Sequence, residues 1–251
     1  MDKNEVLSTV RKQLAKELNC KESDFDYGKI TVTERTCNEP STPALNGCFF
    51  GGGAVFCVKK ELVENLRSFF EGHDPNWIFE SKTLIGLAEK LYLSGNNIDD
   101  MHQFYIPDPS LPKTTVDFEV RRIEKAELCK FKNEPAAKEL FCFEHEGLDS
   151  FGIAAYENGK LIGVACAVKE TENLWQVGVS VLPEKVFGSL TEKLAGLIKD
   201  AVLDMGAVPY FGDLLRSIPV SSASNAGFLP CWSRMVSRPR DDEFIGLRYT
   251  F

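Results

Sequence analysis

The feature that most constrains the fold is a β-hairpin signal in the second half of the chain. Residues 151–156 and 161–168 are two runs rich in strand-forming side chains, and Asn158 and Gly159 stand between them. An Asn-Gly step between two such runs is a strong signal for a tight turn that joins antiparallel strands. Residues 175–181 form a third run, after a polar stretch that suits a turn. A hairpin and a further strand are therefore expected here.

A long amphipathic helix follows these strands. Apolar side chains recur at helical spacing from Leu190 to Met205 and form one stripe. Gly206 comes next, where glycine commonly ends a helix, and residues 208–211 form a short apolar strand. A strand, helix, strand order of this length implies a parallel crossover. We therefore expect an α/β (α+β) fold with a mixed, mostly antiparallel sheet flanked by helices.

A proline-rich stretch, residues 106–112, divides the chain. It holds three prolines, which can continue neither a helix nor a central strand. We therefore expect a smaller N-terminal α/β domain, residues 1–112, and a second domain, residues 113–251. Periodicity elsewhere predicts helices over 3–19, 62–70 and 84–91, and strands over 30–33, 47–58, 117–123 and 244–251.

The charge balance argues against nucleic acid as a partner. The 251 residues include 29 basic and 37 acidic side chains, for a formal net charge of -8, and phosphate neutralisation needs the opposite sign. No apolar run approaches the ~20 residues that span a bilayer, and residues 1–18 are a charged amphipathic stretch without a signal-peptide core. We expect a cytoplasmic monomer or homodimer with no nucleic-acid or membrane partner.

The residue types that commonly hold metals are scattered along the chain. None of the eight cysteines form a C-x-x-C pair, and the three histidines have no ligand spacing. Cysteines inside apolar runs, such as Cys142 and Cys166, are typical of reduced thiols that pack as small hydrophobic side chains. We expect no metal site. Gly51, Gly52 and Gly53 lack phosphate-loop spacing, which favours a bulge or the close approach of another backbone.

The element order of the second half, together with four local strings, resembles the GNAT family of acyl-CoA-dependent N-acyltransferases. The strings begin at Val179 (Val-Ser-Val-Leu-Pro-Glu), Gly206 (Gly-Ala-Val-Pro-Tyr-Phe), Gly227 (Gly-Phe) and Pro230 (Pro-Cys-Trp). They are similar to the end of the family's fourth strand, to its fifth strand, and to the last helix of one bacterial branch. The resemblance covers residues 115–251 and implies a GNAT-type sheet there.

The resemblance also implies a site for acetyl-CoA as co-substrate. In the family, the cofactor lies where the fourth and fifth strands splay apart. Backbone groups of the fourth strand, here Val179, Ser180 and Val181, pair with the pantetheine arm, and the pyrophosphate lies on the N-terminus of the next helix. A helix N-terminus attracts phosphate because it presents unpaired N–H groups and a partial positive charge.

The expected pyrophosphate loop departs from the family pattern, and two alignments remain open. The family has arginine or glutamine, two residues, glycine, one residue, then glycine or alanine. One alignment takes Lys185 as the basic residue and Gly188 as the first glycine, with Leu190 at the small position. The ungapped alignment places Val186 at the arginine, and a phenylalanine and a serine at the glycines. The candidate loop residues are Lys185, Val186, Phe187, Gly188, Ser189 and Leu190.

Acetyl transfer to an amine needs a base for the ammonium proton and benefits from a donor to the departing thiolate. The family's tyrosine acid is absent from the last helix, so Tyr210 and Ser221 are the candidate donors. Glu172 and its neighbour Glu170 are candidates for moving protons through water. The structural alternatives are a half-buried strand aromatic, a helix cap and solvated turn carboxylates. His145 is a further candidate base, or a solvated helix end.

We expect an N-acetyltransferase that moves an acetyl group from acetyl-CoA to an amine of a small molecule or peptide. The N-terminal domain would cover one side of the acceptor cleft, and it is a candidate for a diverged partial copy of the same fold. The alternative is a catalytically degenerate GNAT-like protein that binds CoA or another ligand. The altered loop and the absent tyrosine favour that alternative.

Overall fold

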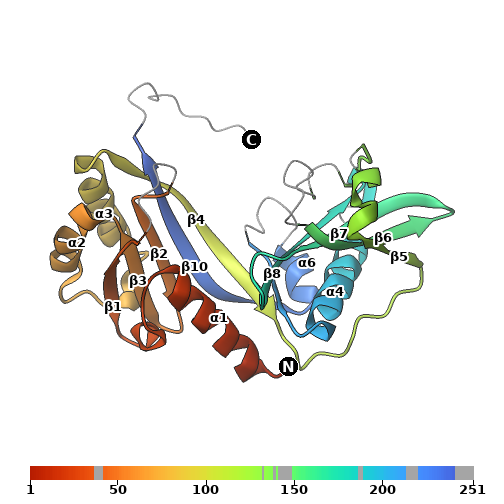
Figure 1. Ribbon diagram of the computed structural model, residues 1–251, viewed down its shortest axis with the longest axis horizontal. Helices are drawn as coiled ribbons and strands as arrows, with labels where there is room; N and C mark the ends of the chain where they lie inside the picture. The colour runs from red at the N-terminus through yellow and green to blue at the C-terminus, as the bar shows by residue number, and fades with distance from the viewer. Residues whose placement is uncertain are drawn as a thin grey trace. The chain divides into compact units, whose positions relative to one another are not determined.

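The chain forms two compact units, each described here by itself. The computed structural model describes residues 1–36, 42–131, 133–137, 140, 149–185, 189–212 and 220–240, and these residues form two sheets of five strands (Figure 1). Unit 1 comprises Met1–Val10 and Gln103–Cys231, and unit 2 comprises Arg11–His102 and Trp232–Phe251. Within the described ranges, no helix is both long enough and apolar enough to cross a bilayer.

Unit 2 is built on a sheet with the strand order β1-β3-β2-β10-β4. Its strands are β1 (Ile30–Glu34), β2 (Leu45–Phe50), β3 (Gly53–Val58), β4 (Asn96–Pro107) and β10 (Phe228–Pro239). Its helices are the part of α1 (Lys3–Glu17) from Arg11 onward, α2 (Val63–Phe70) and α3 (Ser81–Leu93), with short 3-10 turns η1 (Glu22–Phe25), η2 (Lys60–Leu62) and η3 (Pro75–Trp77). Apolar residues of α2 and α3 share one core with β2 and β3. The predicted helices and the strand over 30–33 are confirmed. The region over 47–58, expected as one strand, forms the two strands β2 and β3, and β4 was not expected.

The three consecutive glycines form a tight hairpin between β2 and β3. Gly51 and Gly52 have φ angles of 64° and 86°, a region that side chains with a Cβ rarely adopt. A Cβ on Gly53 would lie 2.7 Å from the carbonyl carbon of Phe25. The expected close approach of another backbone is therefore confirmed at Gly53.

The placement of β10 differs from the linear division at residues 112 and 113. β10 pairs antiparallel with β2, from Trp232 opposite Phe50 to Val236 opposite Asn46, and lies between β2 and β4 (Figure 1). A segment near the end of the sequence thus completes the sheet of the unit that holds most of the N-terminal half. The proline-rich stretch instead follows β4, an edge strand that ends at Pro107, where proline is tolerated.

Unit 1 carries the hairpin and crossover that the sequence predicts. Its sheet has the order β5-β6-β7-β8-β9, with β5 (Glu119–Glu124), β6 (Asp149–Glu157), β7 (Lys160–Val168), β8 (Leu174–Val181) and β9 (Val208–Tyr210). Asn158 and Gly159, with φ angles of 53° and 76°, form the turn between β6 and β7. The pairs from β5 to β8 are antiparallel, and β9 runs parallel to β8. This sheet is mixed and mostly antiparallel, and helices flank it, as the sequence predicts.

Helix α4 (Ser189–Asp204) makes the crossover from β8 to β9 and packs on one face of the sheet. Its buried Leu194 and Ile198 share a core with Val177 and Val179 of β8. The opposite face is covered by η4 (Lys125–Phe131) and the residues after it. Two shorter elements complete unit 1, namely η5 (Pro183–Lys185) and α6 (Val220–Asn225). Because side chains alternate along a strand, Gln176 belongs to the face away from α4.

Candidate active site

Strands β8 and β9 part within unit 1. Their parallel pairing covers Leu174 to Gln176 of β8, and the last pair joins Gln176 to Tyr210. β8 continues to Val181, and in the part of the chain that the structure describes its only strand partner from Val177 onward is β7. The β9-facing edge of this stretch therefore has backbone N–H and C=O groups without a strand to bind. The family resemblance implies the pantetheine arm at this edge.

The three predicted pantetheine residues lie along this open edge. Val179 is 3% exposed and packs in the core with α4, whereas Ser180 and Val181 are partly exposed. Val179 can therefore offer a ligand only its backbone groups.

The N-terminus of α4 follows β8 after a short connection. Ser189 is the first residue of the helix and is exposed, whereas the side chain of Leu190 is 8% exposed and lies in the core. Thr191 is 2% exposed, and among the described residues its Oγ1 has no hydrogen-bond partner. The first turn thus offers backbone donors and one buried hydroxyl. The predicted loop residues Val186, Phe187 and Gly188 lie outside the described residues.

Lys185, the candidate basic residue, already has an anionic partner. Its Nζ lies 3.0 Å and 2.9 Å from the two carboxylate oxygens of Glu157, at the end of β6. Both side chains are partly exposed, so water or a ligand can replace either partner of this ion pair. A phosphate at this position would have to displace Glu157 from the ammonium group.

Tyr210 lies at the point where the two strands part. It is the last residue of β9, is 5% exposed, and donates its hydroxyl hydrogen bond to the Glu170 carboxylate. The Phe104 ring lies 6.0 Å from the Tyr210 ring. A Cβ on Gly212 would lie 2.7 Å from Phe104 and 3.7 Å from Nε2 of Gln176. An aromatic ring, an amide and a phenol–carboxylate pair therefore gather beside the parting strands.

The structure brings Glu170, rather than Glu172, to Tyr210. Glu172 is exposed in the turn before β8, and its backbone carbonyl accepts a hydrogen bond from Nε1 of Trp175 at 3.2 Å. Ser221 is exposed in α6. The side chains of Glu172 and Ser221 are therefore exposed to solvent, and neither shares the hydrogen bond between Tyr210 and Glu170. The third candidate base, His145, lies outside the described residues.

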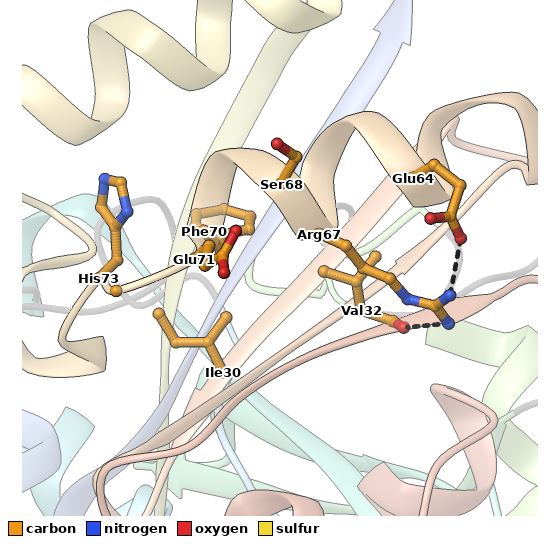
Figure 2. A pocket seen from close by; sticks show the side chains of 9 residues that line it. Ile30, Val32, Glu64, Arg67, Ser68, Phe70, Glu71 and His73 are labelled. Carbon is orange, nitrogen blue, oxygen red and sulfur yellow. Dashed lines mark hydrogen bonds and ion pairs between the residues drawn. The ribbon is translucent and has the colours of Figure 1, made fainter.

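Unit 2 has a separate polar pocket of about 570 Å³ between β1 and α2 (Figure 2). Arg67 projects over it and donates to Glu64 at 2.8 Å and to the carbonyl oxygen of Val32 at 3.3 Å. His73, at the other end, lies against the Phe69 ring at 5.1 Å. None of the predicted site residues lines this pocket. Across the described ranges, no group of three or more histidine, cysteine or carboxylate side chains is placed to hold a metal.

Comparison with known proteins gives structural likenesses only. No protein-family model matches the chain, and no curated protein matches it. A GCN5-related N-acetyltransferase from Kribbella flavida is similar with a TM-score of 0.47 and 15% identity, over 61% of this chain and 64% of that one. This chain therefore spans less than two thirds of that protein.

Two further solved structures are similar at the same level. A GNAT-family acetyltransferase from Colwellia psychrerythraea has a TM-score of 0.44 and 12% identity, over 72% of this chain and 75% of its own. A tandem GNAT protein from the clavulanic acid biosynthesis pathway has a TM-score of 0.41 and 15% identity, over 62% and 59%. These scores are low, and the likenesses carry no conclusion beyond similarity.

Proposed function

We propose that unit 1 is an N-acetyltransferase that moves an acetyl group from acetyl-CoA to an amine of a small molecule or peptide. The observation that carries the proposal is the parting of β8 and β9 after Gln176, with the N-terminus of α4 following β8 and Tyr210 at the point of parting. An open strand edge suits the amide-rich pantetheine arm, and a helix N-terminus suits the pyrophosphate.

In this proposal, the protein binds acetyl-CoA mainly through its backbone. The edge groups of Val179, Ser180 and Val181 pair with pantetheine amides. The N–H groups of Ser189 and Leu190 receive the pyrophosphate, since the first N–H groups of a helix have no intrahelical partner. The remaining proposed contacts come from the connecting loop, namely Lys185, Val186, Phe187 and Gly188.

The acceptor amine would approach from the side of Tyr210. The thioester is polarised by hydrogen bonds, and the ammonium proton of the acceptor must leave before attack. Tyr210 is the proposed side chain nearest this step. Glu172 and Ser221 remain proposals for proton exchange with water, because both are exposed.

Two observations favour a second candidate, a degenerate protein that binds CoA or another ligand without turnover. The Lys185 ammonium is paired with Glu157, and Glu192 adds a carboxylate to the first turn of α4. Both features weaken the attraction of phosphate to this helix end.

Thermal unfolding with millimolar acetyl-CoA, with CoA and ATP as controls, tests the cofactor site. A ligand at a hundredfold over its dissociation constant adds about 2.7 kcal/mol to the free energy of unfolding, a shift of a few degrees for a chain of this size.

The variant Ser189→Glu tests the place of the pyrophosphate, because a carboxylate at a helix start favours the helix but repels pyrophosphate. We expect this variant to lose the acetyl-CoA shift while its ligand-free melting temperature is kept or raised, and Ser189→Ala to keep the shift.

Release of free thiol from acetyl-CoA, measured with a panel of amines, then separates the two candidates. A thermal shift with turnover supports the enzyme, and a shift without turnover supports the degenerate protein. An unchanged shift in Ser189→Glu would mean that the pyrophosphate does not lie on α4.

A further inference from the structure

The hydrogen bond between Tyr210 and Glu170 changes what the tyrosine can do. A phenol has one proton to donate, and its oxygen otherwise accepts hydrogen bonds. In the structure that proton is directed at the Glu170 carboxylate. Toward a third group, such as an incoming ammonium, the oxygen can then act only as an acceptor. This geometry fits proton removal better than the donation to a thiolate expected from the sequence.

The hydrogen-bonded pair of Tyr210 and Glu170 connects a buried phenol with an exposed carboxylate. Tyr210 is 5% exposed, whereas Glu170 belongs to an exposed turn. Local hydrogen bonds fix this turn, because the N–H of Leu174 donates to Oγ1 of Thr171 at 3.0 Å and the N–H of Glu170 donates to the carbonyl of Val168 at 3.1 Å. Glu170 is therefore held against the phenol while it can still exchange protons with solvent.

We propose that Tyr210 and Glu170 form a proton relay that deprotonates the acceptor amine, an inference that rests on the proposed acetyl transfer. The ammonium N–H proton passes to the phenol oxygen as the phenol proton passes to the Glu170 carboxylate. The products are a neutral amine, a neutral phenol and a carboxylic acid. The amine then attacks the thioester carbonyl and the C–S bond breaks, which releases the CoA thiolate. The new amide nitrogen gives its extra proton to that thiolate, and Glu170 returns its proton to water.

The surroundings of Tyr210 support this assignment. Two other side chains lie near Tyr210, those of Phe104 and Gln176. Neither can take up a proton near neutral pH. Glu172, two residues from Glu170, is exposed in the same turn but has no hydrogen bond to the phenol. The control for loss of a carboxylate is Glu119, an exposed residue at the start of β5 with no part in the proposed reaction.

The test compares Glu170→Gln, Tyr210→Phe and Glu119→Gln with the unmodified chain. The probes are a tripeptide with a free α-amine, N-acetyl-lysine amide, spermidine and kanamycin. For any probe that is acetylated, we expect kcat/KM at pH 7 to fall about 10²–10⁴-fold in the first two variants, the usual contribution of a base. The loss should shrink above pH ~8 with the tripeptide, whose α-amine is then already neutral. Glu119→Gln should behave like the unmodified chain.

Each contrary result overturns the relay. A full-activity Glu170→Gln variant would exclude the carboxylate, and an equal loss at every pH would reduce the pair to a structural contact. All variants should keep the acetyl-CoA thermal shift, so loss of that shift would mean that the pair supports cofactor binding instead. If the unmodified chain has neither a shift nor turnover, the proposed function itself fails and the relay fails with it.

Discussion

At the scale of single residues, Lys199 shows how unit 1 satisfies a buried charge. The side chain is 3% exposed, its Nζ donates to the carbonyl oxygen of Ala226 at 2.9 Å, and the Asp200 carboxylate lies 3.7 Å away. Ala226 follows α6, directly before Gly227, whose φ angle is 84°. The lysine therefore ties the middle of α4 to the turn that ends α6.

We predict that Lys199→Met lowers the free energy of unfolding by about 1–3 kcal/mol, because the buried Ala226 carbonyl loses its donor. Urea denaturation measures the change. Lys193→Met is the control on the same helix, since Lys193 pairs with Asp117, an exposed carboxylate, at 2.7 Å, and such pairs contribute less than about 1 kcal/mol. Equal losses in the two variants would contradict the assigned role of Lys199.

Asp26 gives a prediction for acid stability. Hydrogen bonds from Lys29 and from Arg11 hold the pKa of its carboxyl below the usual 3.8. A pKa that is lower in the folded state stabilises the fold above the unfolded pKa, and this contribution is lost as the pH falls through the folded pKa. We expect Asp26→Asn to be less stable than the unmodified chain at neutral pH and to approach it below about pH 3.8. Urea denaturation from pH 7 to pH 3 checks this, and a difference that stays constant with pH would refute it.

The sequence could place Tyr210 but not its partner. The apolar run that forms β9 and the resemblance to the fifth strand were enough to locate the tyrosine beside β8. The choice between Glu170 and Glu172 depends on the turn, in which Thr171 bonds Leu174 and thereby sets which carboxylate faces inward. No periodicity of helix or strand describes such a turn, so the contact could be found only in the structure.

At the scale of elements, α4 is held by the segment that precedes β5. Lys113 pairs with Asp204 at 2.7 Å, and the N–H of Thr114 donates to Asp200 at 2.6 Å. A Cβ on Gly196, in the middle of the helix, would clash with the side chain of Thr114. Glycine is unfavourable in a helix by about 1 kcal/mol, so close contact with this segment explains its presence.

We predict that Gly196→Ala destabilises unit 1 despite the better helix propensity, because overpacking costs about 1–3 kcal/mol. Thr114→Ala removes the two outer atoms of the obstructing side chain. The double variant should therefore lose less stability than the sum of the single variants, as measured by denaturation of all four proteins. Strict additivity would mean that the two residues do not touch.

Elements whose signal is local were predictable, and elements defined by distant partners were not. The Asn158-Gly159 hairpin and the amphipathic stripe of α4 carry their own pattern, and both lie where expected. β10 contains Pro230 and mixes polar with apolar residues, so its pairing with β2 and β4 is what makes it a strand. The predicted strand over 244–251 lies outside the described residues.

At the scale of the whole molecule, each unit is formed by two separate segments of the chain. The boundary between the units falls within β4, between residues 102 and 103, and again within β10, between residues 231 and 232. Trp232 and Met235, both 2% exposed, lie on β10 where it crosses the sheet of unit 2. The C-terminal half, taken alone, would leave these side chains without their core.

We predict that a fragment of residues 113–251 binds a hydrophobic dye and unfolds without a sharp transition, whereas the full chain unfolds cooperatively. Dye fluorescence and circular dichroism during heating measure the difference. A fragment that melts as cooperatively as the full chain would mean that residues 113–251 form an independent domain after all.

The position of β10 also determines the order in which the protein can fold during its synthesis. The N–H of Leu45 donates to Oγ of Ser237 across 192 residues of sequence, so β2 gains this neighbour only after those residues have also left the ribosome. Until then, the hairpin of β2 and β3 presents a free edge, which other strands can join. At about 5–20 residues per second, that interval lasts on the order of ten seconds or more. The nascent protein therefore depends on its own late-arriving strand, or on a chaperone, to keep this edge from aggregating.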